Sequence, residues 1–292
     1  MTRDQIPNRQ LGLERLCKTS APTQDHIAVF PPCHGLERFE AFFHGHPYAP
    51  HRHDTYGLGI TTRGVQSFGY RGETRHSLAG QIYVLHPDEL HDGWAGTSDG
   101  FGYRILHLDP SLVHQALNGR ALPFVSRPVT DNPRLRRALN AFLGHMSEPI
   151  DELAGTGRVV ALADALETIS NGGQKPAPVD PVAVEIARDL LDSYACRTVT
   201  SQDLEDATGQ DRWSLARQFR AAFGVSPHRF QTSRRLDRAR ALIAEGTSLA
   251  EAAHQTGFAD QSHLSRHFRS AFGVPPGVWR TLTETSNGAP VV

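Results

Sequence analysis

The C-terminal part of the chain carries one short sequence pattern twice. Leu215, Phe219 and Phe223 recur as Leu264, Phe268 and Phe272, at a constant offset of 49 residues. The match extends to further positions, with Arg217, Arg220, Gly224 and Pro227 in the first copy answered by Arg266, Arg269, Gly273 and Pro276 in the second. Two copies are too few for a solenoid, which needs stacked neighbours. The pattern suits a protein that holds two equivalent helices at a fixed separation.

Each copy predicts two helices joined by a tight turn. In the second copy, Ser248 and Glu251 have capping-box spacing, Gly257 ends the first helix and Asp260 caps the next. The first copy offers equivalent signals at Thr200, Asp203, Gly209 and Asp211. The Leu and two Phe of each second helix form one buried stripe, which leaves arginines on other faces. A helix-turn-helix places such a helix in the major groove, where Arg can bind guanine.

Residues 182–284 resemble the DNA-binding domain of the AraC family of transcription regulators. The pattern runs from Ser248 through Gly257-Phe258 to Arg280, and Arg235-Leu236 fits the helix that connects the two units. Asp211, where the family often has Ser, and Trp279, where Tyr is commoner, are departures that leave the resemblance intact. The resemblance implies double-stranded DNA as a partner, a homodimer and contact with RNA polymerase. A cytoplasmic location is expected because the cysteines show no disulfide pattern, which suits a reducing compartment.

The candidate DNA-binding residues lie mainly on the two second helices. Arg217 and Arg266 occupy the same slot and are expected to read bases, and Trp213 is expected to pack on a thymine methyl or a sugar. The full set is Arg212, Trp213, Ser214, Ala216, Arg217, Arg220, Arg235, Gln261, Ser262, His263, Ser265, Arg266 and Arg269.

The charge expected of a DNA-binding surface is found in only one part of the chain. The whole chain has a net charge of −1, but residues 212–240 hold eight Arg against Asp237 alone, a balance of +7. Such a stripe is typical of a phosphate-binding surface, and a solvated basic face is the alternative. For Arg235 two roles stay open, because it could contact phosphate or pair with an acidic residue such as Asp206.

Residues 26–125 predict a β-rich domain. Short apolar runs at 39–42, 56–60, 65–70, 81–85 and 102–108 are separated by turn signals such as Arg63-Gly64 and the turn at His46-Pro47. Many short strands at even spacing indicate a sandwich or barrel. The order His51-x-His53, Gly80, Pro87 and His91 resembles a cupin barrel, as in AraC-type sensor domains. A small-molecule effector is therefore expected inside the barrel.

The candidate effector-binding residues combine histidines, aromatic rings and one guanidinium: His51, His53, Tyr56, Tyr83, His91, Trp94 and Arg104. Arg104 is expected to pair with a ligand carboxylate, because its fork matches that geometry, so an anionic metabolite is the expected effector. Metal-binding cupins carry a Glu about four residues after His-x-His, where this chain has Tyr56-Gly57-Leu58. We therefore expect no metal and no cofactor. A three-histidine metal site on His51, His53 and His91 is the alternative.

The remaining segments complete an α+β multidomain organisation: an N-terminal cupin-like β-barrel with flanking helices, and a C-terminal all-α domain with two helix-turn-helix motifs. Residues 126–171 are expected to form helices that pack on the barrel, pair across a dimer, or both. Residues 172–181 form a linker, and 1–25 and 285–292 form tails. The three cysteines, Cys17, Cys33 and Cys196, show no disulfide or metal pattern, and no apolar run predicts a signal peptide or membrane span.

Two function classes follow from this organisation. The first is a transcription regulator that binds DNA and responds to a small molecule in the barrel. The second is a metal-dependent cupin enzyme, of the dioxygenase kind, fused to a DNA-binding module. The missing Glu and the lack of a nucleophile and base pattern favour the regulator, which has no enzymatic activity.

Overall fold

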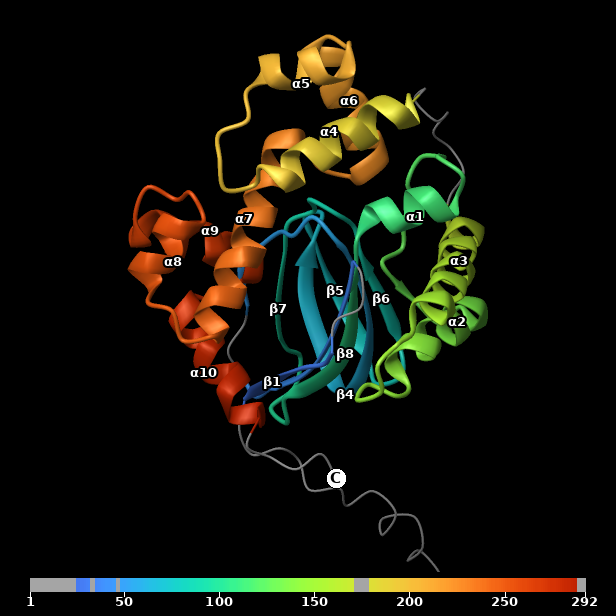
Figure 1. Ribbon diagram of the computed structural model, residues 1–292. Helices are drawn as coiled ribbons and strands as arrows, with labels where there is room; N and C mark the ends of the chain where they lie inside the picture. Colours follow the sequence, from blue (N-terminus) through green and yellow to red (C-terminus); the bar gives the residue numbers. More distant parts are fainter. Residues whose placement is uncertain (1–24, 32–34, 46–47, 171–178, 288–292) are drawn as a thin grey trace, which may run out of the picture.

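The structure, a computed structural model, describes residues 25–31, 35–45, 48–170 and 179–287. The predicted tails, the predicted linker, the turn at His46-Pro47, Cys17 and Cys33 lie wholly or largely outside these ranges. Within them the chain forms a β-rich N-terminal domain and a helical C-terminal domain (Figure 1). This confirms the predicted fold class.

The described residues of the N-terminal domain form a strongly curved nine-stranded sheet. Its strands are β1 (His26–Val29), β2 (Leu36–Phe43), β3 (Tyr48–His51), β4 (Tyr56–Tyr70), β5 (Glu73–Leu78), β6 (Ile82–Leu85), β7 (His91–Ala95), β8 (Phe101–Leu108) and β9 (Val129–Thr130). One path runs β1-β2-β8-β4-β6-β9, while β5 and β7 pair with β4 and β3 pairs with β7. The sheet therefore folds into two facing layers that share β4.

The long strand β4 was predicted as two strands with a turn at Arg63-Gly64. The structure corrects this, because β4 runs unbroken from Tyr56 to Tyr70 with an irregularity between Thr61 and Arg63. Gly64 has φ +66°, and a Cβ there would stand 2.1 Å from the carbonyl oxygen of Gly100. The glycine thus allows close strand approach where β4 passes from one layer to the other, a bulge instead of a turn.

Three helices cover one side of the barrel: α1 (Pro110–Ala116), α2 (Pro133–Leu143) and α3 (Glu152–Ile169). The apolar faces of α2 and α3 are buried, and Leu135, Leu139 and Leu162 pack in one core with Tyr56 and Leu58 of the barrel. These helices therefore pack on their own barrel, one of the two roles that the sequence left open.

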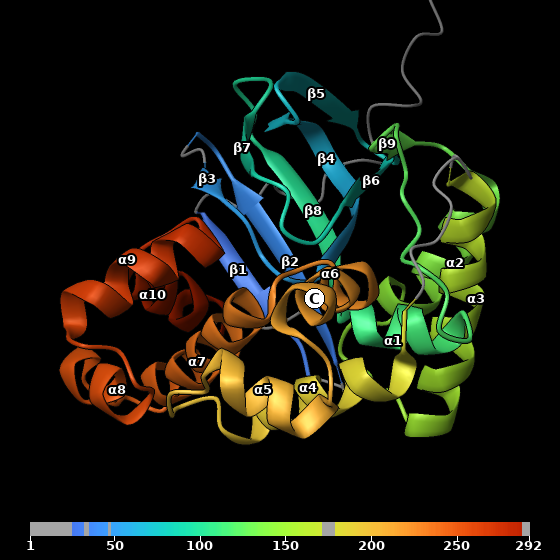
Figure 2. The ribbon, with the colours of Figure 1, turned by 90° about the horizontal axis from the view of Figure 1, so that it is seen from above.

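The C-terminal domain contains α4 (Pro181–Ser193), α5 (Ser201–Thr208), α6 (Arg212–Phe223), α7 (Pro227–Ala244), α8 (Leu249–Gln255), α9 (Gln261–Phe272) and α10 (Pro276–Asn287). Helix α7 runs along the barrel, with α4, α5 and α6 at one end and α8, α9 and α10 at the other (Figures 1 and 2). None of the described helices is long and apolar enough to cross a lipid bilayer.

The duplicated unit appears in the structure as α5-α6 and α8-α9. Asp211 accepts hydrogen bonds from the amides of Trp213 and Ser214, and Asp260 accepts one from His263, so both predicted caps are confirmed. Gly224 and Gly273 end α6 and α9 at φ +75° and +74°. Because such positive φ angles strain other residues, glycine marks the same end point in both copies.

Candidate effector cavity and DNA-binding surface

A cavity opens at the mouth of the barrel, where β3, β7 and β8 face the C-terminal domain. The cavity and the solvent-filled space at its opening together amount to about 820 Å³. The barrel supplies most of its wall. The C-terminal domain closes it with Arg240 of α7, Ala271 and Phe272 of α9 and Trp279 of α10. The cavity is therefore shared between the two domains.

Four histidines gather in the cavity wall. Ring centroids lie 4.3 Å apart for His51 and His91, 4.9 Å for His53 and His91, and 4.6 Å for His53 and His107. His51, His53 and His91 were predicted as site residues. His107, on β8, was missed because it belongs to no motif with them. The alternation of β8 was the one available signal, since it places His107 on the same face as Tyr103 and Ile105.

Backbone carbonyls fix the orientation of three of these rings. The Nδ1–H groups of His51, His53 and His91 donate to the carbonyls of Ala49, Thr55 and Glu89 at 2.9, 2.8 and 2.9 Å. Burial lowers the pKa of His51 to about 4 and that of His107 to about 3, and it holds the pKa values of His53 and His91 well below their usual range. All four rings are therefore neutral near pH 7, and Nε2 of His51, His53 and His91 is left as a hydrogen-bond acceptor.

Neutral imidazoles with fixed Nδ1–H groups are also the form that binds metals. Within the described residues, however, no three His, Cys, Asp or Glu side chains come together in an arrangement that could hold a metal ion.

Tyrosines supply the rest of the polar surface in the cavity. The hydroxyls of Tyr48 and Tyr103 are hydrogen-bonded at 2.7 Å, and the Tyr83 hydroxyl is buried with no hydrogen-bond partner among the described residues. The Tyr83 ring lies against Gly59, where a Cβ would stand 2.0 Å from Cζ. Gly59 thus makes room for the ring.

Three of the seven predicted effector residues lie elsewhere. The Tyr56 hydroxyl donates to the carbonyl of Pro123 at 2.8 Å in the core, and Trp94 lines a separate surface groove. The Arg104 guanidinium pairs with Glu40, with Nε 2.6 Å from Oε2, and also donates to the carbonyl of Leu143. Because Tyr103, Ile105 and His107 face the cavity, the alternation of β8 turns Arg104 away from it.

Arg240 is the one Lys or Arg in the described wall of the cavity. It comes from α7 of the C-terminal domain, and the effector prediction did not include it. Its guanidinium pairs with Glu37 of β2, lies 3.7 Å from a carboxylate oxygen of Asp237, and stacks 5.1 Å from the centre of the Phe272 ring.

Helices α6 and α9 present the predicted DNA-binding side chains. Their Leu and Phe stripes are turned inward, and Arg217, Gln261, Ser262, Arg266 and Arg269 are exposed. Trp213 has 71% of its surface exposed, which is unusual for a ring of this size in a folded chain. Ser214, Ala216, His263 and Ser265 are half-buried on the same helices.

The remaining three predicted DNA contacts are engaged within the protein. Arg212 pairs with Glu205 of α5 at 2.7 Å, and Arg220 lies 3.4 Å from Asp88 of the barrel. Arg235 donates to the carbonyls of Ala195, Gly257 and Arg197. These contacts support the structural role that the sequence left open for Arg235, although its partners are carbonyls and not Asp206.

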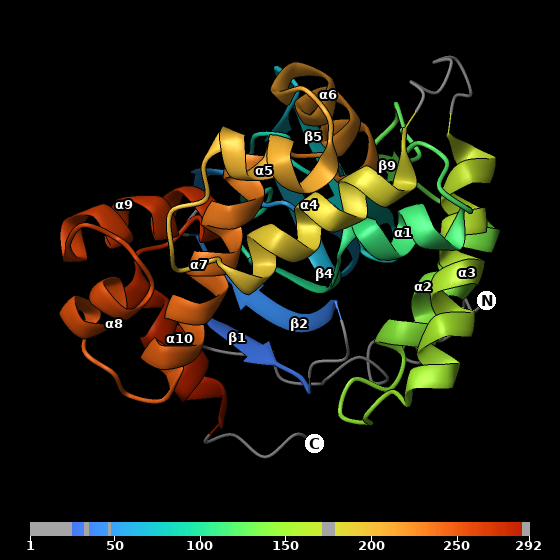
Figure 3. The ribbon, with the colours of Figure 1, turned by 45° about the horizontal axis from the view of Figure 1, so that its top comes forward.

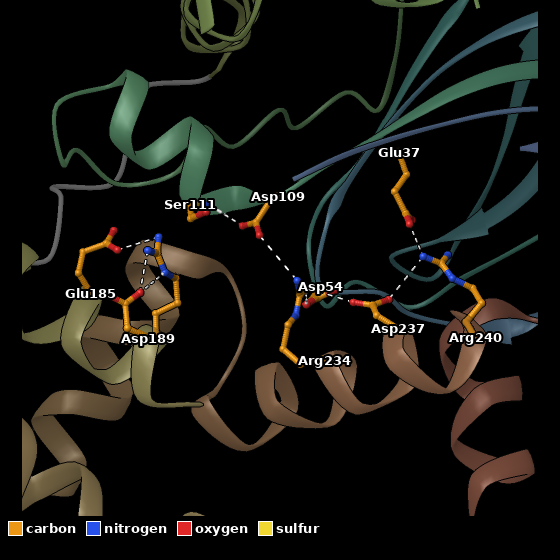
Figure 4. A network of polar contacts seen from close by, with 10 residues as sticks. Glu37, Asp54, Asp109, Ser111, Glu185, Asp189, Arg234, Asp237 and Arg240 are labelled. Atoms are coloured by element: carbon orange, nitrogen blue, oxygen red, sulfur yellow. Dashed lines mark hydrogen bonds and ion pairs between the residues drawn. The ribbon is translucent and has the colours of Figure 1, made fainter. Parts of the chain in front are cut away.

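Much of the basic stripe on α7 faces the barrel. Arg234 pairs with Asp54 at 2.7 Å and approaches Asp109 at 4.0 Å, and Arg240 pairs with Glu37 (Figure 4). Arg229 lies 2.9 Å from Asp88. In this arrangement, carboxylates of the sensor domain form ion pairs with guanidinium groups that were predicted to contact DNA phosphates.

The fold and its two surfaces define a transcription regulator with a ligand-binding domain and a helix-turn-helix DNA-binding domain. Residues 34–163 match the model of the AraC-like ligand binding domain, and residues 204–281 match that of a helix-turn-helix domain. The chain belongs to the AraC family of transcription regulators, as the resemblance implied.

Similar proteins agree with this assignment. The chain is 24% identical over 221 residues to the uncharacterized HTH-type transcriptional regulator YbfI of Bacillus subtilis (strain 168), covering 73% of this chain and 80% of that one. In fold it is similar to ToxT from Vibrio cholerae. The unsaturated fatty acid-bound ToxT structure has a TM-score of 0.61 at 15% identity, covering 89% and 96% of the two chains. ToxT bound to (E)-4-(8-methylnaphthalen-1-yl)but-3-enoic acid has a TM-score of 0.59 at 14% identity, covering 88% and 99%.

Proposed function

We propose that a small molecule bound in the cavity at the barrel mouth controls how the two helix-turn-helix units engage DNA. The observation that carries the proposal is that Arg240, Phe272 and Trp279 of the DNA-binding domain form part of the cavity wall. A ligand there touches both domains, so it stabilises one relative arrangement over others in proportion to its differential contacts. The regulator we propose has no catalytic step and no bound cofactor.

The effector we propose is an apolar carboxylic acid. Its body would pack among Phe39, Phe68 and Ile105, and its carboxylate would pair with Arg240, whose permanent charge replaces the role predicted for Arg104. Hydroxyl or amine groups on the ligand would suit the Nε2 acceptors of the histidines. The two ToxT ligands, an unsaturated fatty acid and a naphthalenyl butenoic acid, support this class.

The proposed assembly is a cytoplasmic homodimer that contacts RNA polymerase on DNA. Helix α3 offers a surface for dimerisation, because Leu153 is 83% exposed and Val160, seven residues further along the helix, is 41% exposed. Seven residues are about two helical turns, so both side chains lie on one outer face.

The DNA-binding part of the proposal is tested with Arg217→Ala and Arg266→Ala in the full chain. Each should weaken binding to a duplex selected from a random library by about 1–3 kcal/mol and relax specificity at one base pair. Gln255→Ala is a matched control, because Gln255 is exposed on α8 and pairs with Glu251 of its own helix. Wild-type affinity and footprints in both arginine variants would show that these residues do not read bases.

A further inference from the structure

The two recognition helices, α6 and α9, both end against the barrel at equivalent positions of the repeat. Gly224 ends α6 and Gly273 ends α9, 49 residues later. A Cβ on Gly224 would stand 2.6 Å from Cβ of Pro87, and a Cβ on Gly273 would stand 2.9 Å from Nδ1 of His51. Each glycine is therefore in direct contact with the sensor domain.

The contact at α9 includes backbone hydrogen bonds. The amide of Ala49 donates to the carbonyl of Gly273 at 3.2 Å, and the amide of Arg52 donates to the carbonyl of Ser270 at 3.0 Å. Carbonyls in the last turn of a helix have no partner within the helix, so these bonds satisfy groups that would otherwise need water. Strand β3 and the residues after it thus cap the end of α9.

The contact at α6 is made by charge as well as by packing. Asp88 lies 3.4 Å from Arg220 of α6 and 2.9 Å from Arg229 of α7, measured between carboxylate oxygen and guanidinium nitrogen. Its side chain is only 7% exposed, and its backbone is left-handed at φ +63°. A strained backbone that holds a buried carboxylate between two domains marks a position fixed by its surroundings.

The two barrel segments that make these contacts, residues 48–53 and 86–91, also carry His51, His53 and His91 of the cavity. They are joined to each other, because the amide of Asp88 donates to the carbonyl of His53 at 2.8 Å. Figure 3 shows α6 and α9 at opposite ends of α7, each beside the barrel. If a ligand displaces the histidines, the two segments that carry them should also move, and with them the contacts at the ends of α6 and α9.

We propose that the sensor barrel holds both recognition helices by their C-terminal glycines through segments 48–53 and 86–91, so that one occupant of the cavity sets the separation of the two DNA-reading helices. The regulatory part rests on the proposed function. The holding contacts themselves are properties of the ligand-free chain and can be tested without DNA.

The first experiment measures the distance between spin labels at Gln202 of α5 and Gln255 of α8 in the full chain, with the native cysteines replaced. Gly224→Ala should broaden a single narrow distance distribution, because the added methyl overlaps Pro87. Gly209→Ala is the matched control: Gly209 also has positive φ, at +67°, but an added Cβ would meet nothing within 4 Å. Equal distributions in wild type and in both variants would overturn the proposal.

Asp88→Asn covers the case in which Gly224→Ala does not fold. It should broaden the same distribution, and it should raise affinity for a fluorescein-labelled random-sequence duplex several-fold. It should also steepen the dependence of log K on log salt by about one or two units, as Arg220 and Arg229 become free for phosphate. Glu73→Gln, on the β4–β5 hairpin, is the control. Narrow distances and unchanged affinity in Asp88→Asn would reject the holding contacts, whereas absence of duplex binding by wild type and variants alike would reject the proposed function.

Discussion

At the residue scale, the cavity combines neutral histidines with unsatisfied acceptors and donors. His51, His53 and His91 could be predicted from the sequence because their order, His51-x-His53 and then His91 after Gly80 and Pro87, resembles that of a cupin barrel. Arg104 was predicted to face the cavity but points away from it. Side chains alternate along a strand, so an error of one residue in the register places a side chain on the opposite face. No local pattern distinguishes the two faces of β8, since both are covered by other parts of the chain.

The histidines should make stability depend on pH. Burial lowers the pKa of His51 from its usual value to about 4, so the folded state binds fewer protons than the unfolded state between about pH 6.5 and pH 4. The stabilising contribution is present above that window and is lost as pH falls through it. His51→Gln cannot be protonated, so it should lose about 2 kcal/mol less stability than wild type between pH 7.5 and pH 5.

Urea unfolding at the two pH values measures this difference. His145→Gln is the control, because the His145 side chain is 82% exposed. A pH dependence in His51→Gln equal to that of wild type would show that His51 is not held neutral by burial.

At the element scale, the C-terminal helices follow from local signals. The signals for each helix lie within a few residues of it. They are the caps at Asp211 and Asp260, the αL glycines and the Leu-Phe stripes, and the structure confirms them. The barrel was harder to predict. Strand β4 continues through Arg63-Gly64 because Gly64 packs closely on Gly100, a contact that no local pattern reveals.

Helix α7 provides a test at this scale. Arg235 donates to three carbonyls, of Ala195, Gly257 and Arg197, and so joins α7 to the chain around α4 and α8. Arg235→Ala should lower the free energy of unfolding by about 2 kcal/mol, because hydrogen bonds from a charged group to three backbone carbonyls are lost. Its salt dependence of DNA binding should match that of wild type. A flatter salt slope with unchanged stability would instead assign Arg235 to phosphate.

At the scale of the whole molecule, sensor carboxylates and DNA-binding arginines meet across one interface. Residues 212–240 carry a net charge of +7, and this segment was predicted to contact DNA phosphates. In the structure, three of its arginines instead pair with acids of the barrel: Arg229 with Asp88, Arg234 with Asp54 and Arg240 with Glu37. These acids lie in different strands and loops of the barrel. Whether these acids pair with the arginines depends on how the two domains dock, and local sequence patterns carry no information about that docking.

The central claim is that cavity occupancy and DNA binding are coupled, and the dissociation constant for a selected duplex tests it most directly. An apolar carboxylic acid that raises the melting temperature of the full chain would first be chosen from a library, since a ligand of the folded state stabilises by mass action. With this acid at saturation, the dissociation constant of wild type should change about 5-fold or more, which corresponds to about 1 kcal/mol of coupling. His53→Ala should keep the affinity of ligand-free wild type and lose that change. An acid that stabilises the chain but leaves the dissociation constant unaltered, or a full response in His53→Ala, would contradict the account.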